Sequence, residues 1–273
     1  MQGQTDRAER LRRLVQPLIL RRTKEMVADD LPEQRTIVLR CEMTPSQSRL
    51  YHATRQQLRS SLFDEVQATD LSRPQDRLRV LTCLQQLRQI ALHPALVQPE
   101  HRNGDSGKLL LLRDQLDTVL AEGQRVLIFS QYVKLLELVR QELKQRKVDF
   151  CYLDGSTGDR AAQVRRFQSD DGPPVFLISL LAGGTGLNLT AARYVFILDP
   201  WWNPAIEQQA LARAHRIGQR HPVLGYKFIV AGTIEEKILA LQQQKLQVAG
   251  EIIPEDGAWL KELTADDLAA LFE

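Results

Sequence analysis

No apolar run in this chain is long enough to cross a membrane, and its first residues lack the hydrophobic stretch of a secretion signal. The 3 cysteines, Cys41, Cys83 and Cys151, are odd in number and form no Cys-x-x-Cys pair. They predict free thiols in a reducing compartment, since disulfide frameworks and structural zinc sites need paired cysteines. The 5 histidines show no metal-ligand spacing either. These absences predict a cytoplasmic protein with no membrane partner and no metal site of its own.

A phosphate-binding loop is also missing. Gly107 and Lys108 look like the end of one, but Arg102 stands where the loop needs glycine and Leu109 where it needs Ser or Thr. Asp199 ends an apolar run, as a magnesium-binding acid would. Without a phosphate loop, however, we expect Asp199 only to fix the turn that follows. The chain alone is therefore not expected to hold a nucleotide's phosphates and magnesium.

Charge of one sign does not dominate, because the net charge is only +2. Its distribution is uneven: residues 7–24 are rich in arginine and lysine, and residues 251–273 are rich in acids. The basic segment could meet phosphates or could simply be a solvated helix face, and both interpretations stay open. The acidic segment is expected to be a solvated tail.

Residues 1 to about 98 are expected to be mainly helical. Thr44-Pro45-Ser46-Gln47 forms a capping box that opens a helix towards Leu62. A second helix is expected from Gln75 to Leu92, stopped by His93-Pro94. Residues 99–107 are polar and contain Gly and Pro, so they predict a boundary loop.

From Lys108 onward, helical segments alternate with short apolar strands. The strands are expected at Val126–Phe129, Phe150–Leu153, Val175–Ser179, Tyr194–Leu198 and Leu224–Val230. Fully apolar strands that alternate with helices predict a parallel sheet with helices on both faces. The second half of the chain is thus predicted to be an α/β domain.

A helix after Asn203 carries candidate functional residues. Asn203 suits the N-cap, Pro204 the first helical position and Gly218 a left-handed stop. Three polar residues follow at i, i+4 and i+7 on one expected face: Gln209, Arg213 and Arg216. Two guanidiniums on one rigid element can clamp an anion and stabilise charge during phosphoryl transfer. The alternative is an ordinary solvated basic face.

Small polar residues follow the expected strands and could bind phosphates. Gly183, Gly184 and Gly186 follow one strand, at the end where ligands of open parallel sheets bind. Alternatively, these glycines could be present only because they allow positive φ angles and close packing. Four more residues of this kind are Ser130, Gln131, Ser156 and Thr157. They suit phosphate hydrogen bonds but are also ordinary turn formers.

Several strings, in order, resemble the SWI/SNF-type branch of superfamily-two helicase-like ATPases. QALARAHRIGQ resembles its motif VI, LAGGTGLNLT its motif V, DPWWNP the motif between them, and LIFSQY its motif IV. LDGST resembles the segment between motifs IV and V, and LILRRTKEMVADDLP with MTPSQSRLY the linker and helical protrusion before the second lobe. The resemblance covers roughly residues 10–248.

This resemblance implies a RecA-like parallel sheet with helices on both faces, preceded by a mainly helical protrusion. The expected domains are a helical linker and protrusion (1–105), the second RecA-like lobe (106–248) and an acidic tail (249–273). The whole enzyme would use ATP with Mg²⁺, shared with a phosphate-loop lobe outside this chain. It would translocate on double-stranded DNA and remodel an unidentified bound protein.

The resemblance also implies roles for individual residues. The nucleotide would be met by Gly186, Asn188, Gln209, Arg213 and Arg216. The DNA backbone would be met by Ser130, Gln131, Gly155, Ser156, Thr157, Gly184 and Thr185. Trp201 and Trp202, which could also be core or interface aromatics, would couple the nucleotide cleft to DNA movement. Leu181 and Arg193 depart from the family pattern, where a basic residue and Asp are common in bacterial sequences.

The alternative function belongs to another class. It is a non-catalytic nucleic-acid-binding or regulatory module that never uses ATP. A phosphate loop upstream in the parent protein distinguishes the two, because only the ATPase needs one.

Overall fold

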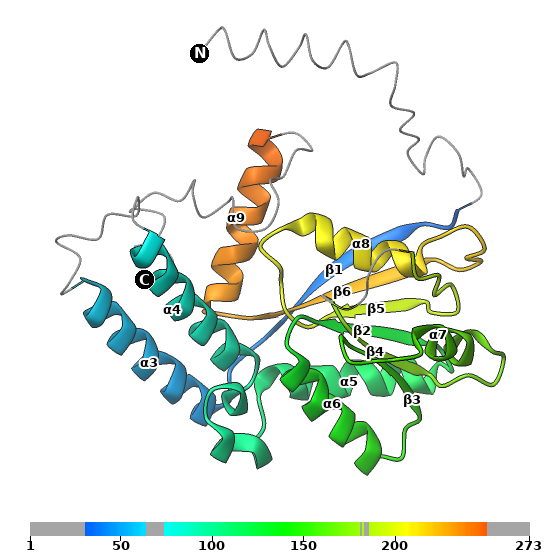
Figure 1. Cartoon of the computed structure of the whole chain (residues 1–273), viewed down its shortest axis with the longest axis horizontal. Helices are drawn as coiled ribbons and strands as arrows, with labels where there is room; N and C mark the ends of the chain where they lie inside the picture. Colours follow the sequence, from blue (N-terminus) through cyan, green and yellow to red (C-terminus); the bar gives the residue numbers. More distant parts are fainter. Residues whose placement is uncertain (1–30, 64–73, 181, 183–185, 250–273) are drawn as a thin grey trace, which may run out of the picture. The chain divides into compact units, whose positions relative to one another are not determined.

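The computed structural model describes residues 31–63, 74–180, 182 and 186–249 (Figure 1). Six strands form one sheet in the order β1-β6-β5-β2-β4-β3, and every pair is parallel. The strands are β1 (Gln34–Cys41), β2 (Val126–Ser130), β3 (Phe150–Leu153), β4 (Val175–Ser179), β5 (Tyr194–Ile197) and β6 (Val223–Val230). This confirms the predicted RecA-like α/β sheet.

Helices cover both faces of the sheet, as expected. Helices α5 (Gly107–Ala121) and α6 (Val133–Gln145) pack on one face, and α7 (Arg160–Gln168) and α8 (Pro204–Ala214) on the other (Figure 1). Along β2, alternate residues serve the two cores: Val126 and Ile128 face α5 and α6, and Leu127 and Phe129 face α7 and α8. Because both faces are buried, the strand reads as a continuous apolar run.

Strand β1 was not predicted, since residues 1–98 were expected to be mainly helical. All eight residues of β1 pair with β6, from Gln34↔Val223 to Cys41↔Val230. Half of β1 is exposed, including Ile37 with 43% of its surface accessible. Its apolar run, Ile37 to Leu39, is short and lies between polar residues, so its local sequence does not distinguish this edge strand. The domain boundaries at 105/106 and 248/249 remain predictions.

A third hydrophobic cluster joins α3 (Pro45–Phe63), α4 (Pro74–Leu92) and α9 (Ile234–Ala249). The predicted capping box at the start of α3 is confirmed, because the Gln47 amide N–H donates to Thr44 Oγ1 at 3.3 Å. Gln47 also donates to the carbonyl oxygens of Ile90 and Ala91, at 2.9 and 2.7 Å, and accepts from the Gly107 amide at 3.1 Å. This single buried side chain therefore ties α3 to the end of α4 and the start of α5.

The expected boundary loop at 99–107 is more ordered than predicted. Short 3₁₀ helices form at Pro94–Leu96 (η3) and Pro99–Asn103 (η4), and buried Ser106 caps α5 by accepting from the Leu109 amide. The basic segment at 7–24 and the acidic segment at 251–273 lie outside the described residues. Within the described part of the chain, no helix has the length and apolar character of a membrane span.

Candidate functional site

The polar segments singled out in the sequence follow neighbouring strands at one edge of the sheet. Since all strands are parallel, the carboxyl ends of β2, β3, β4 and β5 share this edge. The Leu180 amide donates to the Ser130 carbonyl at 2.9 Å, and the Leu198 amide to that of Phe129 at 3.0 Å. The sheet thus brings these turns together, although Leu181, Gly184 and Thr185 lie outside the described residues.

Helix α8 starts where the sequence predicts and ends earlier than expected. The Asn203 side chain accepts from the Ala205 amide at 2.9 Å, which confirms the N-cap. The helix ends at Ala214, so Arg216 lies beyond it and not on its face. His215 leaves the helical conformation, with ψ 80°, and its Nε2 donates to the Pro32 carbonyl at 2.7 Å. This contact from a distant segment explains the early end.

The two arginines are held in different ways. Arg213 is 8% exposed, and its guanidinium carbon lies 5.5 Å from the centre of the Phe129 ring. Burial lowers the pKa of Arg213. Arg216 is exposed, and its Nη1 donates to the carbonyl oxygens of Gly186 and Leu187 at 3.1 and 3.2 Å. Arg213 is therefore a buried cation beside an aromatic ring, and Arg216 is an exposed cation that is hydrogen-bonded to backbone carbonyls.

The end of the Gly-rich turn is fastened to α8. The Leu189 amide donates to the Arg213 carbonyl at 3.0 Å, which adds to the Arg216 contacts with Gly186. Gly186 has φ +96°, a conformation that residues with a side chain rarely adopt, and no atom lies within 4 Å of the place of a Cβ. Gly186 and Asn188 are exposed, as is Gln209 on α8. The structure thus brings the Arg216 side chain to Gly186 and ties the backbone of Arg213 to the same turn.

Asp154 organises the turn after β3, a role that the sequence analysis missed. Its Oδ1 accepts from the Ser156 amide at 2.8 Å and the Ser156 hydroxyl at 2.7 Å. The Asp154 amide in turn donates to Thr157 Oγ1 at 2.9 Å. Hydrogen bonds, led by that of the Ser156 hydroxyl, lower the pKa of Asp154. Asp two residues before Ser is a turn signal, and it leaves Gly155 and Ser156 exposed.

The turn after β2 is closed by Asp199. The Asp199 carboxylate accepts from the Gln131 amide at 3.2 and 3.3 Å, and burial raises its pKa. Asp199 was expected to fix the turn that follows β5, but its carboxylate instead closes the turn that follows β2. Ser130 is fully buried, and its Oγ accepts from the Tyr132 amide at 3.0 Å. Contact of Ser130 with DNA stays a prediction that requires this turn to open.

Lys108, which resembles a phosphate-loop lysine, is committed to a buried ion pair. Its Nζ lies 2.6 Å from both carboxylate oxygens of Glu235 and donates to the Leu198 carbonyl at 2.6 Å. Both side chains are 1% exposed, and burial raises the pKa of Glu235 against the opposite effect of Lys108. Among the described residues, no three His, Cys, Asp or Glu side chains cluster to hold a metal ion.

Trp201 and Trp202 lie between two hydrophobic clusters. Trp201 packs against the cluster under α7 and α8, and Trp202 against that of α3, α4 and α9. The Trp201 amide donates to Glu207 Oε1 at 2.9 Å, and Gln242 donates to the Trp201 carbonyl. The guanidinium of Arg88 lies 5.3 Å from the centre of the Trp202 ring. Arg88, on α4, was not singled out in the sequence.

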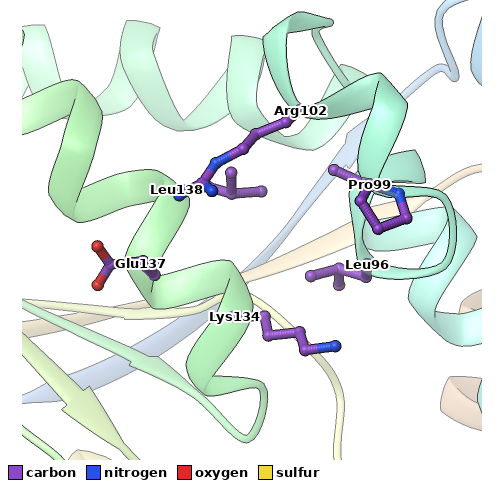
Figure 2. A pocket seen from close by; sticks show the side chains of 7 residues that line it. Leu96, Pro99, Arg102, Lys134, Glu137 and Leu138 are labelled. Carbon is purple, nitrogen blue, oxygen red and sulfur yellow. The ribbon is translucent and has the colours of Figure 1, made fainter.

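A cavity of about 250 Å³ lies between η3, η4 and α6 (Figure 2). Lys134 and Leu138 of α6 face Leu96 and Pro99 across it (Figure 2). Its full lining is Ala95, Leu96, Pro99, Arg102, Lys134, Glu137 and Leu138. It shares no residue with the cluster of Gly186, Arg213 and Arg216.

The sequence was also compared with known proteins. A family model described as "Helicase conserved C-terminal domain" matches residues 107–218, and one described as "SNF2-related domain" matches residues 1–96. YwqA of Bacillus subtilis (strain 168), whose name places it provisionally among ATP-dependent helicases and translocases, is 38% identical over 97% of this chain. The human SWI/SNF-related matrix-associated actin-dependent regulator of chromatin subfamily A member 1 is 33% identical over 92% of it. The chain spans 29% and 25% of these relatives.

Solved structures agree with these matches. The Sulfolobus solfataricus SWI2/SNF2 ATPase core in complex with dsDNA superposes with a TM-score of 0.73 at 31% identity, covering 97% of this chain and 56% of that one. The Sulfolobus solfataricus SWI2/SNF2 ATPase C-terminal domain gives a TM-score of 0.70 at 28% identity, covering 88% of this chain and 99% of that one.

Proposed function

Because this chain belongs to the SWI/SNF-type ATPases of helicase superfamily two and forms their C-terminal lobe, we propose that it works as half of a double-stranded-DNA translocase. The other half would be a phosphate-loop lobe of the same parent protein. The pair would move on DNA and remodel a bound protein. The site of action is wherever that DNA lies: the cytoplasm and nucleoid of a bacterium, or the nucleus of a eukaryote.

The observation that carries this proposal is the cluster of Gly186, Arg213 and Arg216. Its residues fit a nucleotide's phosphates, because Arg216 is exposed beside open space at Gly186. Gly186, Asn188, Gln209, Arg213 and Arg216 would hold ATP from this side. When bound, ATP with Mg²⁺ supplies the phosphoryl group that is transferred to water. Charge that develops during transfer would be met by the two guanidiniums acting as arginine fingers.

Each guanidinium would contribute differently. Arg213 is already stripped of water, so its attraction for an anion is strengthened by the low local dielectric. Arg216 now donates to two neutral carbonyl oxygens. A charged phosphate oxygen is a stronger acceptor, so Arg216 would exchange these partners on nucleotide binding. That exchange would release the Gly-rich turn.

The Gly-rich turn and the turn at 154–157 would meet the DNA backbone. Gly155 and Ser156 are exposed on a turn whose shape Asp154 fixes. Hydrogen bonds to phosphates position a protein without reading sequence, as movement along arbitrary DNA requires. The Sulfolobus ATPase core that was solved with dsDNA supports DNA as the partner. Ser130 and Gln131 would add contacts if their turn opens. Gly184 and Thr185 are proposed to add contacts as well.

Trp201 and Trp202 would pass closure of the cleft to these DNA contacts. Trp201 is hydrogen-bonded to Glu207 in the first turn of α8. A shift of α8 on closure of the cleft would therefore move the tryptophan segment, as hinge and lid movements in other proteins transmit ligand binding to distant sites.

ATP turnover and DNA binding of the purified chain and of its full-length parent test the proposal. We expect no turnover by the chain alone, with or without DNA, and DNA-stimulated turnover by the parent. The chain should bind fluorescent duplexes weakly and without sequence preference, because it neutralises few phosphates. Its affinity should fall as salt rises, because binding releases counterions from the DNA. Robust turnover by the chain alone would overturn the two-lobe proposal. A parent that binds DNA without turnover would favour the non-catalytic module.

A further inference from the structure

The segment between β5 and α8 is held at four successive residues. Lys108 Nζ donates to the Leu198 carbonyl at 2.6 Å, and Asp199 accepts from the Gln131 amide at 3.2 Å. Arg88 Nη2 donates to the Pro200 carbonyl at 2.7 Å, and the Trp201 amide donates to Glu207 at 2.9 Å. The partners come from α5, the end of β2, α4 and α8. The segment is thus a junction of separate elements.

We call α3 and α4 the helical protrusion. Of the four partners named above, Arg88 belongs to this protrusion. It is 4% exposed, and its guanidinium carbon lies 5.3 Å from the Trp202 ring centre and 5.9 Å from that of Tyr132. Its neighbours Leu84 and Leu87 on α4 are fully buried in the cluster shared with α9. Arg88 therefore stands on a firmly packed helix.

The chemistry of this contact requires arginine. A planar guanidinium can donate in its plane to Pro200 while its face stacks on an aromatic ring, whereas lysine is a point charge that cannot do both. A buried cation is also costly, and an apolar residue would fill the same space at lower cost. Space filling alone does not explain Arg88.

We propose that Arg88 is a positioning residue that links the helical protrusion to the tryptophan segment, so that displacement of Pro200–Trp202 moves α4. This rests on the proposed function, because the displacement is the one expected on closure of the nucleotide cleft. The protrusion then acts as a lever driven from the β5–α8 connection. A force applied to the protrusion would in turn displace the β5–α8 connection.

The link itself is tested on the 273-residue chain by a double-mutant cycle of Arg88→Met and Trp202→Ala. Chemical denaturation gives the stability of each variant. The double variant should lose less than the sum of the single losses, since each single change removes the same contact. Additive losses would overturn the link. Gln85→Met, an exposed change on the same helix, combined with Trp202→Ala, is the additive control.

Transmission is tested in the full-length parent by DNA-stimulated ATPase and triplex displacement. Arg88→Met should lower displacement per ATP hydrolysed by about three- to tenfold, a range within reach of a residue outside both sites. Gln85→Met should not. If Arg88→Met fails to fold, Arg88→Lys decides, because it keeps the charge and a donor for Pro200 and loses the stacking. An unchanged ratio in the folded variant would overturn transmission.

The two proposals fail in different ways. A wild-type parent without ATP turnover defeats the proposed function. If the double-mutant cycle is nevertheless non-additive, Arg88 makes a structural contact only, and the proposed transmission is overturned as well. An active parent whose ratio is unaffected by Arg88 substitution defeats this inference alone.

Discussion

At the scale of single residues, Arg213 and Arg216 differ in what their removal would expose. Arg213 covers the Phe129 ring and is nearly buried, whereas Arg216 lies on the surface against two carbonyl oxygens. Truncating Arg213 removes packing as well as charge. Truncating Arg216 removes only exposed hydrogen bonds. The two substitutions should therefore be alike in catalysis and unlike in stability.

Arg213→Ala and Arg216→Ala in the parent enzyme should each lower the turnover number by up to about 10³–10⁵-fold, if both are arginine fingers. DNA affinity should change little. Arg213→Ala should also lower the melting temperature, and Arg216→Ala should leave it near that of the wild type. Lysine should rescue either position poorly, because it lacks the planar fork. Normal turnover in both folded variants would show that the two arginines are not catalytic and belong to an ordinary solvated basic surface.

Gly186→Ala should destabilise the chain by about 1–3 kcal/mol, because a side chain is strained at φ +96°. Gly155→Ala is the matched control: it is exposed, has no positive φ and also faces open space. Urea unfolding of both variants measures the difference. Equal stabilities would show that the conformation of Gly186 is not enforced by its contacts with Arg216.

Local signals in the sequence sufficed for residues whose partners are close in the chain. The Thr44–Gln47 capping box and the Asn203 N-cap are confirmed for this reason. Arg88 and Glu235 were missed because their partners, Pro200 and Lys108, lie far away in the sequence. A buried charge paired across the fold leaves no local pattern. The roles of the predicted site residues in binding remain predictions.

At the scale of elements, the five predicted strands agree with the structure to within a residue at either end. Strands β2, β4 and β5 are almost wholly apolar because every one of their residues is buried, whereas β3 and β6 are partly exposed. Strand β1 was not predicted because its apolar run, Ile37 to Leu39, is short and lies between polar residues. The end of α8 was misplaced because His215 makes a contact with Pro32 that sequence spacing cannot show.

The ion pair that joins α5 to α9 makes stability depend on pH in a defined direction. Lys108→Met leaves Glu235 buried without its partner, which should cost about 3–5 kcal/mol near neutral pH. Burial already raises the pKa of Glu235 above 4.5, and loss of Lys108 raises it further. A carboxyl group with a raised folded-state pKa stabilises the fold below its unfolded pKa and loses that effect as pH rises.

The loss caused by Lys108→Met should therefore shrink as the pH falls from 8 towards 5. Urea unfolding at both pH values measures it. Lys134→Met, at an exposed lysine of α6, provides the control and should cost little at either pH. A loss for Lys108→Met that does not vary with pH would contradict protonation of Glu235.

At the scale of the whole molecule, the Trp202→Ala variant tests whether ATP hydrolysis is coupled to translocation. If the tryptophan segment transmits closure, the variant of the parent should lose translocation more than ATP hydrolysis. If Trp202 only fills space, the change should cost up to about 3–5 kcal/mol and lower both activities together. Melting temperature, ATPase and triplex displacement on one variant distinguish these outcomes. Equal losses with a large drop in melting temperature would rule out coupling.

The pairing of β1 with β6 also sets an order of events during synthesis. Gln34 leaves the ribosome well before its partner Val223, which emerges only after the four other strands have been made. Contacts between such distant segments form late, because a long loop must close first. Until then β1 has no neighbour, and β5 ends the growing sheet with an open edge. The nascent chain must therefore pass through a stage in which β1 is unpaired and β5 is open on one side, and there association with another chain competes with folding.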